Sequence, residues 1–241
     1  MIKKICIVST SEENFLTPPF LLYCAKSKKI DIEIVFIPGF LSLKRIFYSV
    51  LMLNLIEIFE IIYFKLFKNS AHYQCKTNYF KNINKNEFLN FINKKKFDLL
   101  VSYNCNQIFN EKTLKKINCS IVNFHPGILP KYKGLFPNFY SLLNNENYIG
   151  ITFHEIEKKI DSGKIIKSFK IKINNKDTVF KLYKKIFLDK KSHEFMLKSI
   201  LNYKKLIKYK FKARDSYKYR GYPKLSDIIK LKLKKGHLLN K

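Results

Sequence analysis

The sequence predicts an α/β fold: a Rossmann-like, mostly parallel sheet with helices on both faces, followed by a small basic C-terminal extension. Apolar, β-rich runs alternate with segments of helical periodicity along most of the chain, and this alternation is typical of parallel strands joined by crossover helices. The 241 residues are 46% hydrophobic, which is enough for one sizeable core. We therefore expect a main domain over residues 1–202 and a basic extension over 203–241.

The expected elements follow one another in order. In the first half, apolar runs, helical spacing and an opening proline predict a strand at 3–10, a helix at 17–28, a strand at 30–38, a helix at 46–67, a helix at 87–96 and a strand at 98–103. In the second half, the same signals predict a helix at 110–116, a strand at 119–125, a helix at 137–145, strands at 149–156 and 164–173, and a helical stretch from 177 to about 201. Residues 69–86 are polar and are assigned no element. Because ligand sites in such folds lie at the carboxyl ends of strands, the end of the strand at 119–125 is the expected place for a site.

Residues 46–67 are the most apolar stretch of the chain. They approach the length of a membrane span, but charged residues interrupt them and the longest uncharged run is 11 residues, too short to cross a bilayer as a helix. On a helix, Asn54, Glu57 and Glu60 form one narrow polar stripe on an otherwise apolar surface. We expect a helix buried in the domain or at a subunit interface, and the alternative is a monotopic membrane contact with a basic pair at its head.

The chain is strongly basic, with 47 Lys and Arg against 18 Asp and Glu. A formal charge of +29 fits a nucleic acid, an anionic membrane face or a phosphorylated substrate as partner. The overuse of Lys, Asn, Ile, Phe and Tyr throughout the chain fits a compositional bias equally well. Five widely spaced cysteines without a CxxC pair indicate neither a disulfide framework nor a zinc knuckle. We expect a cytoplasmic protein without a signal peptide and without a metal.

Three residue types with a common chemistry stand near strand ends. The sequence contains no Walker loop, GxGxxG, GxSxG or HExxH motif, so the usual signals of nucleotide-driven, hydride-transferring and hydrolytic enzymes are missing. It does contain Asn123, His125 and, between two later strands, Asp161. An amide can donate to a developing oxyanion, an imidazole can move a proton near neutral pH, and a carboxylate can orient the imidazole. Such a trio suits attack of an amine on a carbonyl, although Asp-Ser-Gly is also an ordinary turn and a strand-end His is often only hydrogen-bonded.

Several motifs occur together around this trio. NFHPGILPKYKG is followed by PNFYSLLNN, GITFHEIEKKIDSGKII and KDTVFKLYKK. In this order they resemble the folate-dependent formyltransferase family, whose signature runs Asn-x-His, a Leu-Pro turn, a basic or aromatic residue before Gly, Gly-x-Thr and Asp-x-Gly-x-Ile. The 36-residue separation of His125 and Asp161 also fits the family. The resemblance covers residues 98–188; before it only the strand-helix-strand pattern agrees, and after residue 210 the likeness is loose.

The resemblance implies that residues 1–202 are a formyltransferase catalytic domain, an enzyme that transfers a formyl group from 10-formyltetrahydrofolate to a primary amine. By similarity, Asn123 would hold the carbonyl oxygen, His125 would stabilise the charged intermediate and help to move protons, and Asp161 would orient His125 and help to deprotonate the amine. The resemblance also places the folate pterin against two loops, which here contain Asn106, Gln107, Ile108, Phe109, Ile156 and Ile160.

A second histidine is close to the trio in sequence. Strand alternation sends Thr152 and His154 to the same side of their strand, and similar family members also have His at this position. We expect His154 to be a buried, hydrogen-bonded histidine and not a second catalyst.

Departures from the family bear on the acceptor amine. The loop STSEENFLTPP lacks the glycine-rich turn expected of glycinamide ribonucleotide formyltransferases. The chain after Leu201 is short for the barrel with which methionyl-tRNA formyltransferases hold tRNA. PNFYS and RGYPKLSDIIKLKLKKG are most similar to enzymes that formylate nucleotide-linked amino sugars, so a nucleotide sugar is the expected acceptor. A methionyl-tRNA formyltransferase-like enzyme is the alternative, and an inactive formyltransferase-like module that binds RNA or a membrane is the alternative of another class. A tRNA partner and a homodimer stay open, and we expect no stable membrane insertion.

Overall fold

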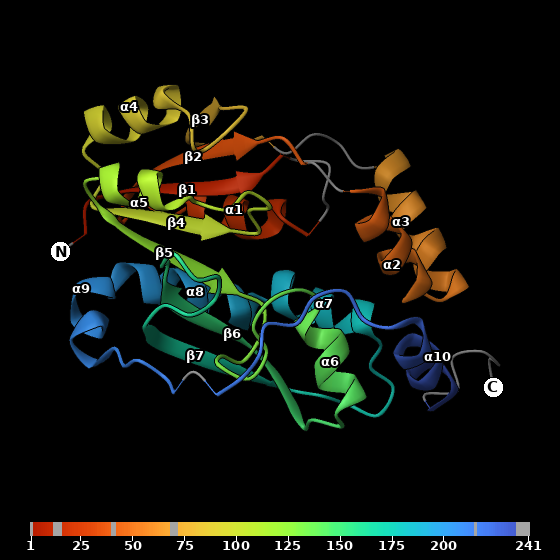
Figure 1. Cartoon of the computed structure of the whole chain (residues 1–241). Coiled ribbons are helices and arrows are strands. Elements are labelled where there is room, and N and C mark those ends of the chain that lie inside the picture. The colour runs from red at the N-terminus through yellow and green to blue at the C-terminus, as the bar shows by residue number, and fades with distance from the viewer. Residues whose placement is uncertain (1, 12–15, 40–41, 68–71, 215, 235–241) are drawn as a thin grey trace.

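A seven-stranded sheet forms the centre of the molecule (Figure 1). The computed structural model describes residues 2–11, 16–39, 42–67, 72–214 and 216–234. The strands, in the spatial order β3-β2-β1-β4-β5-β6-β7, are β1 (Lys4–Thr10), β2 (Asp31–Ile37), β3 (Lys76–Tyr79), β4 (Leu99–Tyr103), β5 (Ser120–His125), β6 (Tyr148–Glu155) and β7 (Ile165–Lys172). β1 to β5 pair in parallel, and β6 and β7 continue the sheet antiparallel. The predicted α/β fold with a mostly parallel sheet is confirmed.

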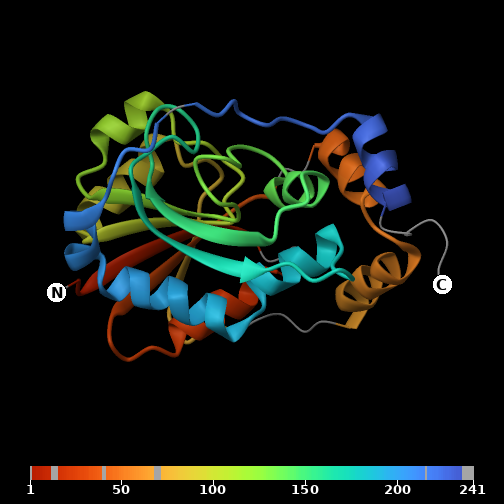
Figure 2. The ribbon, with the colours of Figure 1, turned by 90° about the horizontal axis from the view of Figure 1, so that it is seen from below.

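Helices cover both faces of this sheet (Figures 1 and 2). They are α1 (Pro18–Ala25), α2 (Leu43–Leu51), α3 (Leu55–Phe67), α4 (Asn86–Lys95), α5 (Glu111–Lys116), α6 (Pro137–Leu143), α7 (Val179–Phe187), α8 (Lys190–Leu201), α9 (Tyr203–Leu206) and α10 (Leu225–Lys234). Alternate residues of β1 belong to different cores: Ile5 and Ile7 pack in the larger cluster with α1, α7 and α8, whereas Cys6 and Val8 pack in the smaller cluster with α4. This two-sided burial explains why the central strands are apolar runs and not alternating patterns.

Two expectations about secondary structure need correction. The polar passage 69–86 contains a short strand, β3, which pairs with β2 alone at the edge of the sheet. An edge strand has one free side, where polar side chains are tolerated, and KTNY therefore gave no apolar signal. The helical stretch 177–201 consists of two helices, α7 and α8. The side chain of Asp189 accepts hydrogen bonds from the N–H groups of Lys191 and Ser192 and so caps the start of α8.

The apolar stretch 46–67 also consists of two helices. The chain breaks after α2, and a reciprocal pair begins α3: Asn54 Oδ1 accepts from Glu57 N at 2.9 Å, and Glu57 Oε2 accepts from Asn54 N at 3.0 Å. No residue of α2 is buried, and among the described side chains of α3 only Glu57 is buried. The expectation of a helix buried in the domain is therefore wrong, because the apolar side of this hairpin lies on the surface.

The basic extension lies against the main domain along its described part, 203–234. After α9 and a 3-10 turn η1 (Ile207–Tyr209), Phe211 pairs with Ile165 of β7 and Arg220 pairs with Gly134. In α10, Ile228 and Leu231 belong to the larger core cluster. The extension thus contributes to the core as well as to the surface.

Candidate active site

The carboxyl end of β5 presents two polar side chains next to two others from β6. The antiparallel register pairs Asn123 with His154 and His125 with Thr152. Directly paired residues, and alternate residues of one strand, share a face of the sheet. All four side chains therefore project from the same face at the carboxyl end of β5.

Thr152 holds the turn that follows β5. Its hydroxyl donates to the carbonyl of Gly127 at 2.7 Å and accepts from the N–H of Leu129 at 3.1 Å. Because Thr152 also stands opposite His125 in the register, the turn and the imidazole are fixed to the same strand.

Asp161 reaches the cluster from the turn between β6 and β7. Its backbone has a φ of 51°, and two residues later Gly163 passes so close to Glu155 that a Cβ would lie 1.7 Å from the carbonyl oxygen. Only glycine permits this approach. The Oδ2 atom of Asp161 lies 3.4 Å from Nδ1 of His125 and accepts a hydrogen bond of 2.8 Å from the N–H of Gly134.

His125 is buried and both of its ring nitrogens face a polar group. Nε2 lies 2.7 Å from the carbonyl oxygen of Tyr132, and since a carbonyl can only accept, Nε2 carries a hydrogen. Nδ1 faces Asp161, so a second proton on the ring would complete an ion pair with that carboxylate. The ring is therefore held between the carbonyl of Tyr132 and the carboxylate of Asp161.

His154 orients the amide of Asn123. Nδ1 of His154 lies 2.8 Å from the carbonyl of Glu155 and so donates to it, which leaves Nε2 to accept from Asn123 Nδ2 at 3.1 Å. Burial lowers the pKa of His154 and so does His125, whereas Asp161, whose Oδ1 lies 3.8 Å from Nε2, raises it. The imidazole is neutral at physiological pH and leaves the second N–H of the amide for another acceptor.

Together these groups suit acyl transfer to an amine. The second amide hydrogen of Asn123 can donate to an oxygen that becomes negative, His125 can hold or release a proton, and Asp161 can balance its charge. A small pocket opens beside the carboxylate; it is lined by Leu129, Pro130, Lys133, Asp161, Ser162, Gly163, Ile165, Lys212 and Ala213.

The first two residues predicted to contact the folate lie in the loop after β4. The N–H of Asn106 donates to Thr10 Oγ1 at 3.2 Å, while its buried side-chain oxygen has no hydrogen-bond partner among the described residues. The amide of Gln107 bridges a neighbouring loop, since Oε1 accepts from Ile83 N at 3.0 Å and Nε2 donates to Lys81 O at 2.9 Å. Asn106 thus has an unused acceptor, whereas Gln107 holds two loops together.

The four apolar residues predicted to contact the folate differ in exposure. Ile108 is 61% exposed, but Phe109 is 4% exposed and packs in the smaller core cluster. Ile156 is half-buried against the same cluster, and Ile160 is exposed on the turn before Asp161. Of the two apolar walls expected in the loop after β4, Ile108 is therefore the one at the surface.

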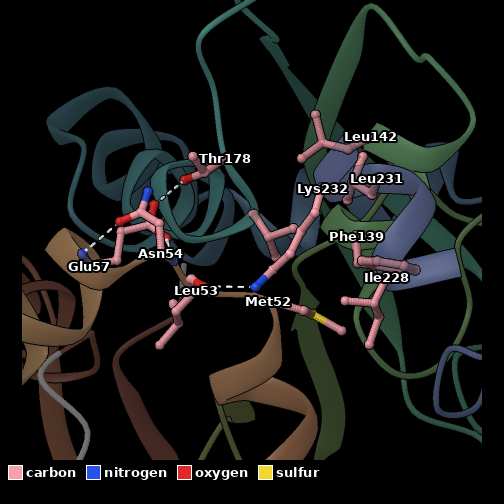
Figure 3. A pocket seen from close by; sticks show the side chains of 11 residues that line it. Met52, Leu53, Asn54, Glu57, Phe139, Leu142, Thr178, Ile228, Leu231 and Lys232 are labelled. Atoms are coloured by element: carbon pink, nitrogen blue, oxygen red, sulfur yellow. Dashed lines mark hydrogen bonds between the residues drawn. The ribbon is translucent and has the colours of Figure 1, made fainter. Parts of the chain in front are cut away.

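Sequence reasoning missed the main-chain groups of Tyr132 and Gly134, because any residue supplies a carbonyl or an N–H and no side-chain pattern marks them. A larger pocket than that beside Asp161 lies elsewhere, between the α2–α3 turn, α6, α7 and α10, and no predicted site residue lines it (Figure 3). Part of the loop STSEENFLTPP, residues 12–15, lies outside the described residues.

Known proteins resemble this chain in sequence and in fold. The model of the family "Formyl transferase" matches residues 62–200. The bifunctional polymyxin resistance protein ArnA of Wigglesworthia glossinidia brevipalpis is 32% identical over 68% of this chain and 25% of its own length. The methionyl-tRNA formyltransferase of Lactobacillus acidophilus is 40% identical over 37% of this chain and 28% of its own length. The dTDP-4-amino-4,6-dideoxyglucose formyltransferase of Mycobacterium tuberculosis H37Rv is 32% identical over 38% of each chain.

A solved structure agrees with the fold. The sugar N-formyltransferase from Shewanella superposes with a TM-score of 0.58 at 16% identity, covering 95% of this chain and 86% of its own. The chain matches between a quarter and about two fifths of the length of the relatives named above. The family model covers more than half of the chain, and its motifs meet at one strand end. The chain belongs to the formyl transferase family.

Proposed function

We propose that this chain is an N-formyltransferase that uses 10-formyltetrahydrofolate to formylate the primary amine of a nucleotide-linked amino sugar. The observation that carries the proposal is the meeting of Asn123, His125 and Asp161 at one strand end, with 3.4 Å between His125 Nδ1 and Asp161 Oδ2. Membership of the formyl transferase family indicates formyl transfer as the reaction of this site. The same three residues on an unrelated fold would indicate only general acyl chemistry.

The loop after β4 fits the folate donor. Pterin edges carry N–H donors and pterin faces are flat and apolar, so a site needs an unused acceptor beside an apolar wall. The buried side-chain oxygen of Asn106 and the exposed side chain of Ile108 supply these. When bound, the donor supplies a formyl carbon that is open to attack.

In the proposed mechanism, the second amide hydrogen of Asn123 donates to the formyl oxygen as negative charge develops on it. Asp161 accepts the proton that the ammonium of the acceptor must lose. The bond from the amine nitrogen to the formyl carbon forms, the bond from that carbon to the folate nitrogen breaks, and the amine proton ends on the folate nitrogen. For this transfer, Nε2–H of His125 exchanges its bond to Tyr132 for one to the reacting group.

The acceptor class rests on two observations. One relative is named as a dTDP-4-amino-4,6-dideoxyglucose formyltransferase. In addition, the segment that pairs with Gly134 carries Arg220, whose guanidinium lies 5.2 Å from the ring centroid of Tyr132 and 4.8 Å from that of Tyr140. Its buried Nε has no hydrogen-bond partner among the described residues. A cation fixed beside the trio would suit the diphosphate of a nucleotide sugar.

Formylation of methionyl-tRNA is the second candidate. It is favoured by the likeness to a methionyl-tRNA formyltransferase and by the charge of +29. An inactive module that binds RNA or a membrane would need no catalytic trio, and all three residues are present and close together.

Formation of tetrahydrofolate, followed by absorbance, tests the reaction with dTDP-linked and UDP-linked amino sugars and with methionyl-initiator tRNA. Asn123→Ala, His125→Ala and Asp161→Ala should each lower turnover by roughly two to four orders of magnitude. The exposed residues His72 and Asn118 offer matched controls, and His72→Ala and Asn118→Ala should leave turnover unchanged. Turnover within a few-fold of the wild type in any trio variant removes that residue from the mechanism.

Salt separates the two acceptors. Binding of tRNA through six or more phosphates should collapse between 50 and 200 mM salt, since the log-log slope is roughly −0.9 for each duplex phosphate contact. A nucleotide sugar offers few phosphates, so we expect its turnover to fall only a few-fold. Steeply salt-dependent transfer to tRNA, with none to amino sugars, would promote the second candidate.

A further inference from the structure

The α2–α3 hairpin and α10 lie together at one end of the molecule (Figure 1), and many of their large apolar side chains are exposed. We call it the outer face, and its exposed side chains are Leu43, Ile46, Phe47, Val50, Leu55, Ile56, Phe59, Ile62, Tyr63, Leu66, Leu225, Ile229 and Leu233. The side chains of Leu43 and Phe59 are 84% and 69% exposed. A monomeric soluble protein rarely exposes so many large apolar side chains together, and a patch of this kind is typical of an interaction site.

The orientation of α3 is the reverse of that of an ordinary surface helix. Its acidic residues are on the side that faces α7: Glu57 is 3% exposed and accepts a hydrogen bond from the hydroxyl of Thr178 (Figure 3). Glu60, which is 31% exposed, forms an ion pair with Lys184 of α7 at 2.7 Å. Two polar contacts to α7 and its cap thus fix the helix with its apolar side outward. The exposure therefore follows from specific bonds of this chain.

α10 lies beside the hairpin and extends the same surface (Figure 2). Lys232 Nζ donates to the carbonyl of Leu53 at 3.3 Å, between α2 and α3. Just before α10, the hydroxyl of Tyr222 lies 3.3 Å from that of Ser42, and its ring lies 4.9 Å from Lys44 Nζ. The three helices are thus held as one unit.

The charges around the outer face are mostly positive. Residues 42–66 and 222–234 contain seven basic residues, Lys44, Arg45, Lys65, Lys224, Lys230, Lys232 and Lys234, and three acidic ones, Glu57, Glu60 and Asp227. Of the three acids, Glu57 is buried and Glu60 is neutralised by Lys184. A partner must therefore offer an apolar interior and negative charge at its rim.

We propose that the outer face docks on the surface of an anionic lipid bilayer. Apolar and aromatic side chains enter the boundary of headgroups and acyl chains, and the lysines meet anionic headgroups. A second copy of this chain fits less well, because both copies would bring the same excess of positive charge to the contact, and like charges across an interface oppose binding. No helix in the described part of the chain is long and apolar enough to span a membrane, so the contact is peripheral.

Flotation with vesicles of phosphatidylcholine and phosphatidylglycerol, and with phosphatidylcholine alone, tests the proposal on the full chain. We expect binding to the anionic vesicles, weakened by high salt because exposed charges are screened. Phe59→Ser with Ile62→Ser should reduce the partition coefficient at least about tenfold, since both side chains lose their apolar area. The control Tyr209→Ser removes an equally exposed ring on η1 and should change little.

Charge variants test the electrostatic part. Lys224→Gln with Lys230→Gln should weaken binding roughly fivefold for each lysine. Lys94→Gln with Lys116→Gln makes the same change of charge on α4 and α5, away from the outer face, and should have a clearly smaller effect. All these side chains are exposed, so we expect melting temperatures near that of the wild type.

Three results would overturn the proposal. The first is that the chain does not float with anionic vesicles. The second is that the substitutions of Lys94 and Lys116 weaken binding as much as those of Lys224 and Lys230. The third is that light scattering finds a dimer at micromolar concentration and that Phe59→Ser with Ile62→Ser makes the chain a monomer. The outer face would then be the contact between two copies of the chain.

Discussion

Replacement of His154 by Phe tests how the amide of Asn123 is positioned. The ring keeps its bulk but loses Nε2, which accepts from Asn123 Nδ2 at 3.1 Å, and Nδ1–H, which donates to Glu155 O at 2.8 Å. A net hydrogen bond is worth about 0.5–1.5 kcal/mol, so we expect kcat to fall roughly 2- to 12-fold as the amide loses its orientation. Asn123→Ala removes the donor itself and should cost roughly 100- to 1000-fold.

A double-mutant cycle distinguishes orientation from direct catalysis. In the Asn123→Ala background, His154→Phe should change kcat less than about twofold, because no amide is left to orient. The pH profile of His154→Phe should keep the shape of the wild type, since burial lowers the pKa of His154 and the imidazole does not titrate near neutrality.

The measurements are kcat and KM for the four proteins across pH 6 to 9, with a thermal melt of each as a control for folding. A loss above about 100-fold that persists in the Asn123→Ala background, or the disappearance of one limb of the pH profile, would refute the positioning role. His154 would then transfer a proton itself.

Two further predictions concern the turn that contains Asp161 and the buried histidine His193. Gly163→Ala places a Cβ 1.7 Å from Glu155 O and should displace Asp161, lowering kcat at least about tenfold, whereas Gly221→Ala, with nothing within 4 Å of its Cβ, should not; equal kcat values would contradict the reasoning. Burial lowers the pKa of His193, whose Nε2 bonds to Phe187 O at 2.7 Å. Below about pH 6.5 His193 therefore binds a proton in the unfolded chain but not in the folded chain, and the free energy of unfolding falls as pH falls. The melting temperature should drop between pH 7 and pH 5, and less steeply in His193→Gln; an equal slope would show that another group titrates.

Much of the fold and part of the candidate site follow from local sequence. β1, β2, β4 and β5 were predicted within two residues because a strand buried on both faces must be a short run of β-branched and apolar residues. Asn123 and His125 were placed at a strand end for the same reason. β3 was missed, because it pairs on one side only and its polar sequence resembles a loop.

Only the tertiary structure decided which groups meet at that strand end. Alternation puts Thr152 and His154 on one side of a strand but does not say which strand lies opposite, and the register with β5 makes His154 the partner of Asn123. The bond of His125 to Tyr132 O is to a main-chain atom, which no residue type encodes.

The hairpin α2–α3 separates the two kinds of information most clearly. Helical periodicity determined that Asn54, Glu57 and Glu60 share one stripe and that the remaining surface is apolar. Periodicity carries no information on which side faces the core, because that depends on what packs there. Thr178 and Lys184 supply polar partners for Glu57 and Glu60. Burying an acid is costly unless it is paired, so these partners allow the polar stripe to face α7, with Glu57 buried, and leave the apolar side at the surface.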